Sequence, residues 1–237
     1  MPRSFSVGAH VGVKKRKRFW AFLVIRTIAN ALVITGIVFS FLAFAPFVKQ
    51  EIWYWWKSNF QAISKPVDSQ DTNQPKVKAV ELPPLSVEPE SKEFGIVIEK
   101  IGVNAPVVAN VNASSYPEYI GAMTKGVAHA KGTAFPGSTK AENNNVFLFA
   151  HSAMNRVGAP KYNSVFYLLR KMEAGDRVST FYQGKRYDYI VSDKRVVEAK
   201  DVQYLTDPSK EPILTLQTCD PPGMNIRRLI VTAKLVQ

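Results

Sequence analysis

The N-terminal part of the chain contains 22 consecutive residues, 27–48, without a single charge. At about 1.5 Å per residue, roughly 20 residues cross a hydrocarbon core of about 30 Å, and only a helix satisfies the backbone of a single segment there. The apolar run begins at Phe19 and is interrupted only by Arg26, whose long side chain can reach back to the headgroups. We therefore predict a transmembrane anchor over residues 19–48.

The flanks of this run predict its orientation. Residues 14–18 read Lys-Lys-Arg-Lys-Arg, and residues 53–56 read Trp-Tyr-Trp-Trp. Basic flanks stay in the cytoplasm and aromatic residues gather at the interface, so residues 1–18 form a cytoplasmic tail and the rest lies outside. A cleaved signal peptide is the competing interpretation, but its apolar core spans only about 7–15 residues and ends at small residues. We expect an uncleaved, single-pass anchor in the cell membrane.

The charge distribution argues against nucleic acid as a partner. The net charge is +12, but residues 1–60 hold nine Lys or Arg and one acid, which leaves +4 for the remaining residues. A nucleic-acid-binding domain would carry its basic stripe on the folded body. The single cysteine, Cys219, also excludes a disulfide framework and a cysteine-rich zinc site.

The composition divides the rest of the chain into a linker and a β-rich domain. Residues 49–92 are predicted to form an extracytoplasmic stalk, largely extended and solvated because prolines and polar residues dominate from 58 onward. Residues 93–237 alternate short apolar runs with turns, which predicts a mainly β fold, an eight-stranded barrel with short helices. The expected strands are 94–100, 106–111, 126–129, 146–150, 177–183, 185–198, 212–219 and 228–236, with helices at 114–123 and 162–172 and a compact loop at 199–211 holding one helical turn at most.

Three kinds of side chain that can take part in catalysis fall at the ends of predicted strands. Cys219 ends one apolar run, His151 follows another, and Arg227 and Arg228 open the last. In isolation a lone cysteine is more often an inert buried residue, and a histidine at a strand end more often a surface residue. A thiol, an imidazole and a guanidinium can form one site if these strands are neighbours.

Five segments in this order together resemble the sortases, membrane-anchored cysteine transpeptidases of bacterial cell surfaces. Thr-Leu-Gln-Thr-Cys at 215–219 is similar to the family's TLxTC signature, and Gly126–Gly137 to its GVGHYPGTALPG segment. The other three are the opening strand and turn at 96–107, the run that ends in Phe-Ala-His-Ser at 149–152, and Arg-Leu-Ile-Val at 228–231. The resemblance implies a sortase-like barrel over 93–237 and agrees with the predicted anchor and stalk.

The resemblance also implies an activity. A sorting-signal peptide of the LPxTG kind would form a thioacyl intermediate on Cys219, resolved by an amine of a cell-wall precursor or a pilin lysine. Cysteine attacks as the thiolate, and a neighbouring cation favours that form. His151 would exchange protons with the leaving and incoming amines, while an arginine holds the substrate or the oxyanion.

Several assignments stay open at this stage. Strand alternation allows only one arginine to face the site, and we favour Arg228, with Arg227 as the alternative. Thr218 either contacts substrate or fills a strand position, and His129 is expected to be structural or substrate-lining.

We expect no cofactor and no metal. The acidic residues form no dense cluster that would indicate a calcium site, although Glu118, Glu142 and Asp176 stay open as ligands.

Two alternatives to the transpeptidase remain. The chain is either a surface cysteine peptidase that hydrolyses the peptide, or an inactive scaffold that uses the barrel for peptide binding. An L,D-transpeptidase fits less well because the chain has no His-Gly-Cys motif.

Overall fold

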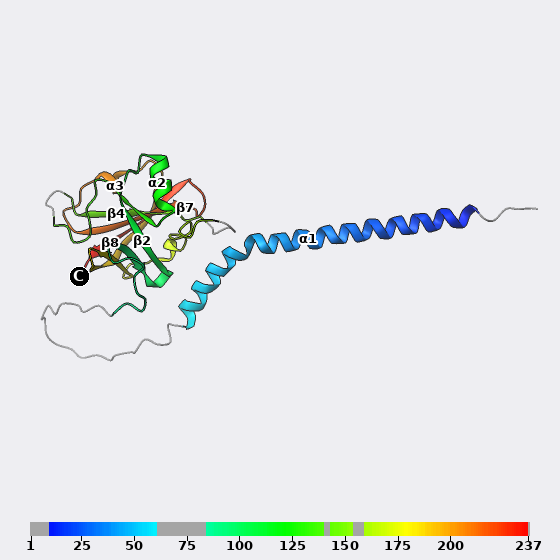
Figure 1. The fold of residues 1–237 in the computed structure, drawn as a ribbon, viewed down its shortest axis with the longest axis horizontal. Helices are drawn as coiled ribbons and strands as arrows, with labels where there is room; N and C mark the ends of the chain where they lie inside the picture. Colours follow the sequence, from blue (N-terminus) through cyan, green and yellow to red (C-terminus); the bar gives the residue numbers. More distant parts are fainter. Residues whose placement is uncertain (1–9, 61–83, 140–142, 154–158, 237) are drawn as a thin grey trace, which may run out of the picture. The chain divides into compact units, whose positions relative to one another are not determined.

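The structure is a computed structural model that describes residues 10–60, 84–139, 143–153 and 159–236. The chain divides into two compact units, Met1–Ile52 and Trp53–Gln237. Helix α1 spans His10–Phe60, and within it Phe19–Leu42 is long and apolar enough to cross a membrane (Figure 1). The helix covers the span predicted from sequence and extends past it, through the aromatic residues at 53–56. Most of the predicted stalk, residues 61–83, lies outside the described residues.

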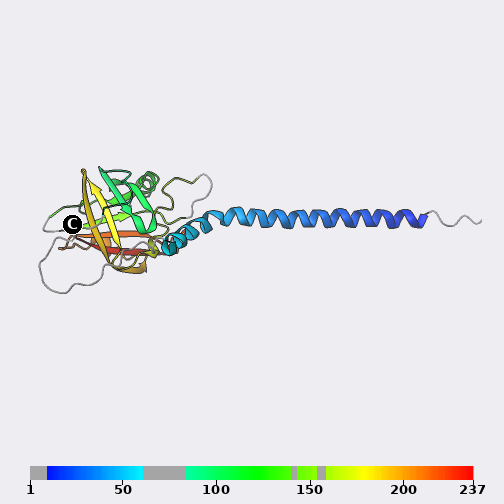
Figure 2. The ribbon, with the colours of Figure 1, turned by 90° about the horizontal axis from the view of Figure 1, so that it is seen from below.

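The second unit is built on a closed barrel of eight strands, as the sequence predicted (Figure 2). Around the barrel the order is β1-β2-β3-β4-β7-β8-β6-β5. The β2/β3 and β4/β7 pairs are parallel and the other pairs antiparallel. The bounds are β1 Phe94–Ile98, β2 Val103–Val111, β3 Val127–Ala130, β4 Asn145–Phe149, β5 Arg177–Tyr182, β6 Lys185–Glu198, β7 Ile213–Asp220 and β8 Arg227–Leu235.

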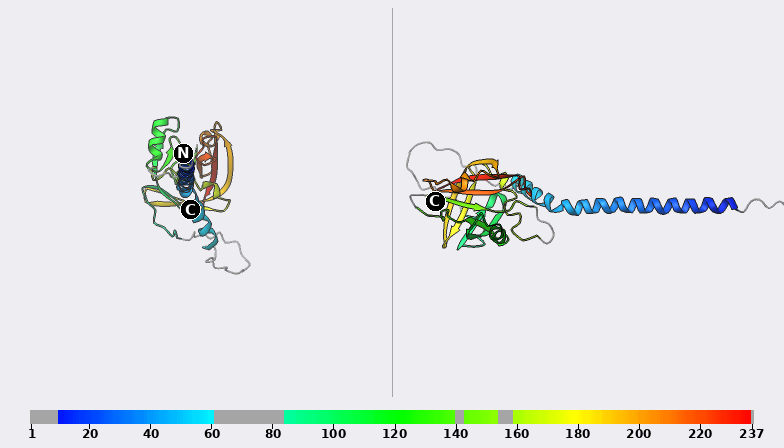
Figure 3. Two further views of the ribbon diagram at one scale, coloured as in Figure 1. Left: turned by 90° about the vertical axis from the view of Figure 1, so that its right-hand side faces the viewer. Right: turned by 90° about the horizontal axis from the view of Figure 1, so that it is seen from above.

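Short helical elements complete this unit. Helix α2 (Tyr116–Met123) lies outside the ring of strands (Figure 3), and α3 (Gln203–Thr206) is the single helical turn expected in the loop before β7. Two 3₁₀ turns, η2 (Glu99–Ile101) and η3 (Leu169–Lys171), follow β1 and precede β5.

The helix predicted over residues 162–172 is wrong. The structure has successive tight turns there and only η3 as a helical element. The reason is burial on every side: Phe166, Tyr167, Leu168 and Leu169 are all buried in succession, whereas a surface helix buries only one face. Backbone bonds from residue i to i+3 wind the segment tightly enough to do this.

Strand β4 is buried on both faces, because two apolar clusters meet across it. Alternate residues Val146 and Leu148 point into the main core inside the barrel. Phe147 and Phe149 point the other way, into a second cluster formed with α2 and residues of the α3 turn. The unbroken apolar run of this strand therefore reflects two cores, and the second one lies beside the site described next.

Candidate active site

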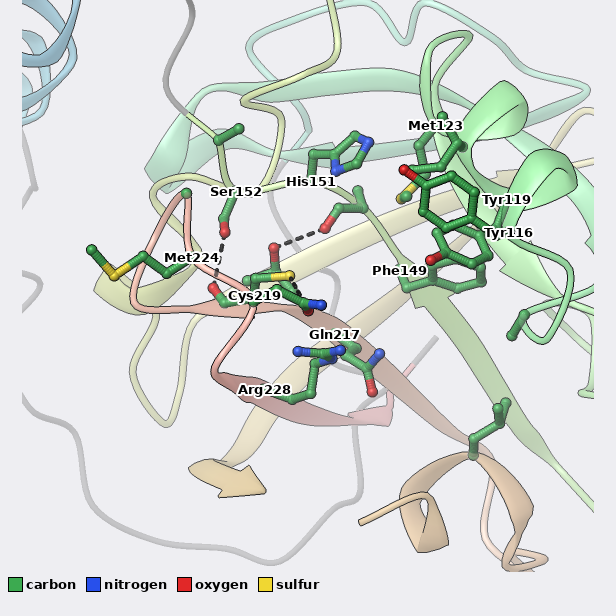
Figure 4. Close-up of a pocket in the computed structure, with 18 of the residues that line it drawn as sticks. Tyr116, Tyr119, Met123, Phe149, His151, Ser152, Gln217, Cys219, Met224 and Arg228 are labelled. Carbon is green, nitrogen blue, oxygen red and sulfur yellow. Dashed lines mark hydrogen bonds between the residues drawn. The ribbon is translucent and has the colours of Figure 1, made fainter. Parts of the chain in front are cut away.

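The strand order brings His151, Cys219 and Arg228 together at one end of the barrel. Strands β4 and β7 run parallel with Phe149 opposite Gln217, so His151 and Cys219 follow at the same level. Strand β8 lies on the other side of β7 and pairs Arg228 with Cys219. The sulfur consequently lies between the imidazole and the guanidinium (Figure 4).

These three side chains line one pocket of about 350 Å³. One part of it is apolar, because α2, α3 and the outer face of β4 supply aromatic and aliphatic side chains. The other part holds the thiol and the polar groups around it. The lining residues include Ala113, Tyr116, Tyr119, Ile120, Met123, Phe147, Phe149, Leu205, Gln217, Thr218, Met224 and Asn225, besides the three named above.

Hydrogen bonds fix the ends of β4 and β7 to each other. The Thr218 hydroxyl, which is buried, donates to the carbonyl oxygen of Ala150 over 2.8 Å. The Ser152 hydroxyl donates to the carbonyl oxygen of Cys219 over 2.9 Å (Figure 4). These bonds bracket His151 and Cys219, so the spacing of imidazole and thiol is held by the backbone. Thr218 thus has a positioning contact in addition to its place in the pocket lining.

Burial shifts the pKa of both reactive groups in the direction that favours the uncharged form. It raises the pKa of the Cys219 thiol, and the Arg228 guanidinium opposes this shift as the smaller effect. It lowers the pKa of the His151 imidazole. The thiol–imidazole pair is therefore mostly neutral near pH 7, and the thiolate–imidazolium form is a minor state.

The two consecutive arginines face different surroundings. Arg228 lines the pocket, and its Nη1 donates to the carbonyl oxygen of Arg227 over 3.0 Å. Arg227 is exposed and forms an ion pair of 2.9 Å with Asp220. The geometry thus brings Arg228, and not Arg227, to the thiol, because the register of β7 and β8 sets Cys219 opposite Arg228.

The structure places His129 away from this pocket. It lies in β3, fully buried, with its ring between Phe94 and Phe135 at centroid distances of 5.5 and 4.6 Å. Its Nδ1 accepts the backbone N–H of Asn110, and its Nε2 lies 2.9 Å from the carbonyl oxygen of Ala134. These contacts agree with the predicted structural role of His129, which does not line the pocket.

Sequence reasoning missed several residues of the pocket, most notably Gln217 and Asn225. Gln217 could have been found by strand alternation, because it lies two residues before Cys219 and so on the same face of β7. Its side-chain amide has no hydrogen-bond partner within the described residues. Asn225 belongs to the turn between β7 and β8, and no local pattern of the sequence points to it.

Glu118 and Asp176, two of the acids left open as metal ligands, have other partners in the structure. No group of three or more His, Cys, Asp or Glu side chains is placed to hold one among the described residues. Glu118 accepts the backbone N–H of Asn112, and Asp176 pairs with Lys100 over 2.8 Å. Glu142, the third acid considered from sequence, lies outside the described residues.

Comparisons with known proteins agree with this architecture. Residues 96–236, more than half of the chain, match the family model of the sortase domain. Sortase C-1 from Actinomyces oris is 27% identical, with a TM-score of 0.50 over 61% of this chain and 73% of that one. Sortase C1 of GBS Pilus Island 1 is 26% identical, with a TM-score of 0.50 over 61% and 64%. A search of curated proteins gives no significant match.

Proposed function

The chain belongs to the sortase family, and on this premise we propose that it is a cysteine transpeptidase with Cys219 as the nucleophile. Its substrate is the C-terminal sorting signal of a secreted surface protein, of the LPxTG kind. The acceptor is an amine of a cell-wall precursor or a pilin lysine. The N-terminal helix holds the enzyme in the cell membrane, with residues 1–18 in the cytoplasm and the barrel outside.

One observation carries the proposal: thiol, imidazole and guanidinium line the same pocket at the ends of adjacent strands. A nucleophile, a proton carrier and an oxyanion donor are the three groups that acyl transfer at a peptide bond requires. The apolar part of the pocket gives the side chains of an extended peptide a place beside the thiol. An inactive scaffold would need the apolar part but not the three polar groups.

In the first half-reaction Cys219 gives its proton to His151 and the sulfur attacks the carbonyl carbon of the scissile bond. The oxygen of the tetrahedral intermediate becomes negative, and the Arg228 guanidinium donates to it. His151 then protonates the leaving nitrogen, the C–N bond breaks, and the acyl group stays on sulfur as a thioester.

In the second half-reaction the incoming amine attacks the thioester carbon and gives a proton to His151. The C–S bond breaks, a new amide forms, and the sulfur recovers its proton. Because the reactive thiolate–imidazolium state is minor, its fraction is highest between the lowered pKa of His151 and the raised pKa of Cys219. We expect a broad, bell-shaped pH profile between those two values.

The test uses the full chain in detergent micelles, as wild type and as Cys219→Ala, with a pooled library of LPxTG-like peptides. Intact mass spectrometry should show an acyl adduct on the wild type alone, which added hydroxylamine or triglycine removes. Triglycine should also appear covalently joined to the peptide product.

The other outcomes decide between the alternatives. An adduct that water resolves at a rate unaffected by amines would identify a hydrolytic peptidase. No adduct across the library would favour the scaffold interpretation.

A further inference from the structure

Asn225 makes the only side-chain hydrogen bond to the Cys219 thiol found within the described residues. The sulfur lies 3.7 Å from Asn225 Oδ1 and donates its proton to that oxygen. Asn225 lies in the turn between β7 and β8, six residues after the cysteine, and lines the same pocket. The resting thiol is therefore in contact with an amide that has no role in the two half-reactions of acyl transfer.

The amide of Asn225 can serve both protonation states of the sulfur. Its two ends have similar shape, one a carbonyl acceptor and the other an NH₂ donor. A thiol needs an acceptor, whereas a thiolate has no proton to give and needs a donor. Asn225 is exposed and its side chain has no other hydrogen-bond partner within the described residues, so rotation of the amide breaks no second contact.

We propose that Asn225 is a catalytic residue that accepts the S–H of the resting Cys219 and, after rotation of its amide, donates an N–H to the thiolate. The proton leaves the sulfur for His151, and the amide supplies a hydrogen bond to the charge left behind. The inference rests on the proposed function only in taking Cys219 as the nucleophile.

Other groups near the thiol must be separated from this effect. Besides Cys219, the charged or titratable side chains that line the pocket are His151 from the segment after β4, Arg228 from β8, and Tyr116 and Tyr119 from α2. Asp220 follows Cys219 directly on β7 and is paired with Arg227. None of these changes when Asn225 is replaced, so a change in thiol titration reports the amide.

The test is the rate of alkylation of Cys219 by iodoacetamide between pH 5 and 10, measured on the full chain in detergent micelles. Cys219 is the only cysteine of the chain, so the rate reports this sulfur alone. Asn225→Ala removes the donor and should raise the pH midpoint, lowering the rate at pH 7 about threefold. Asn225→Asp adds a negative charge beside the sulfur and should lower that rate about tenfold or more.

Ile226→Ala is the matched control, because Ile226 is an exposed neighbour in the same turn and does not line the pocket. It should titrate like the wild type. A midpoint in Asn225→Ala that is unchanged or lower would overturn the proposal, whatever Asn225→Asp does. Alkylation needs no peptide, so a wild type that forms no acyl adduct would defeat the proposed function while this titration still decides the role of Asn225.

Discussion

Two histidines of the barrel, His129 and His151, have different surroundings although they belong to neighbouring parts of the sheet, β3 and the segment after β4. His129 lies within β3, 0% exposed, and both ring nitrogens have backbone partners. Its Nδ1 accepts and its Nε2 donates, so the neutral ring satisfies its neighbours and a second proton would face the N–H of Asn110. In this region the histidine is a core residue, and each of its ring nitrogens has a backbone partner.

His151 follows the end of β4 and lines the pocket that contains the thiol. Its ring has no hydrogen-bond partner among the residues that the structure describes. Burial lowers the pKa of both histidines, so the direction of that shift does not separate them. The difference is the availability of a ring nitrogen: only His151 can take and give a proton without breaking a contact.

The largest effect should come from exchanging the imidazoles one at a time. We expect His151→Gln to lower kcat/KM by about 10²- to 10⁴-fold, because general acid–base catalysis is lost, with little change in unfolding temperature. His129→Gln is the matched variant and should leave kcat/KM of the folded fraction near wild type. Steady-state transfer assays and thermal unfolding of both variants give the comparison. The contrast between the two histidines would be refuted if His129→Gln lost activity to the same degree while remaining fully folded.

The neighbouring arginines repeat the contrast on β8. Arg228→Gln should reduce kcat/KM about 10²- to 10³-fold, as expected for loss of an oxyanion donor, and should also raise the pKa of Cys219 further. Arg227→Gln removes only an exposed ion pair, so both activity and stability should stay close to wild type. Transfer kinetics and iodoacetamide titration of the two variants measure this. Equal losses of kcat/KM in both variants would show that the β7/β8 register does not determine which arginine acts in catalysis.

A third prediction concerns stability instead of activity. His129→Leu leaves the N–H of Asn110 and the carbonyl of Ala134 without their buried partner, which should cost about 2–4 kcal/mol of unfolding free energy. Denaturant titration followed by circular dichroism measures the loss. His151→Leu is the control and should cost clearly less, because its ring has no such partners within the described residues. A larger loss for His151→Leu would reverse the comparison.

The pH dependence of stability should sharpen the contrast further. Because the pKa of His129 is lower in the folded protein, the unfolded chain binds more protons below about pH 6.5. This contribution is fully present above that pH and is lost as the pH falls toward the folded value, by at most about 1.4 kcal/mol per pH unit. Unfolding free energies of wild type and His129→Leu at pH 7.5 and 5.5 should show a smaller acid loss in the variant. An identical loss would mean that His129 does not titrate differently on folding.

The smallest effect should come from Thr218→Val. It removes the hydroxyl donated to Ala150 at nearly constant volume, leaving that carbonyl short of one partner, at about 1 kcal/mol. The spacing of His151 and Cys219 should loosen with it, so kcat should fall a few-fold while KM changes less. Denaturant titration and transfer kinetics on Thr218→Val test this. Thr215→Val is the control, because Thr215 is a buried threonine on the opposite face of β7 whose hydroxyl donates to Asn145 Oδ1 outside the pocket. A changed KM with unchanged kcat would instead favour direct substrate contact.

Much of the fold could be predicted because its signals are local. Period-two alternation and turn residues located all eight strands to within a few residues, as for β6, which spans Lys185–Glu198 as predicted. The failure at 162–172 has a physical cause. Tyr162, Val165, Phe166 and Leu169 have the spacing of a helical apolar stripe. Tyr167 and Leu168 are buried as well, so the segment is packed on all sides and the spacing alone does not distinguish a helix from tight turns. In the candidate site the strand-end residues were found, whereas Asn225 was not, because its partner lies across a turn whose shape the local pattern does not give.

The sequence by itself determined which elements form: an apolar helix long enough to cross a membrane, eight β-strands, and a thiol, an imidazole and two arginines at strand ends. Only the tertiary structure decided which of these meet. The parallel β4/β7 pair sets His151 beside Cys219, and the β7/β8 register selects Arg228 over Arg227. The reason is that propensity and alternation act between residues close in the chain, whereas strand order and register depend on packing between residues far apart in it.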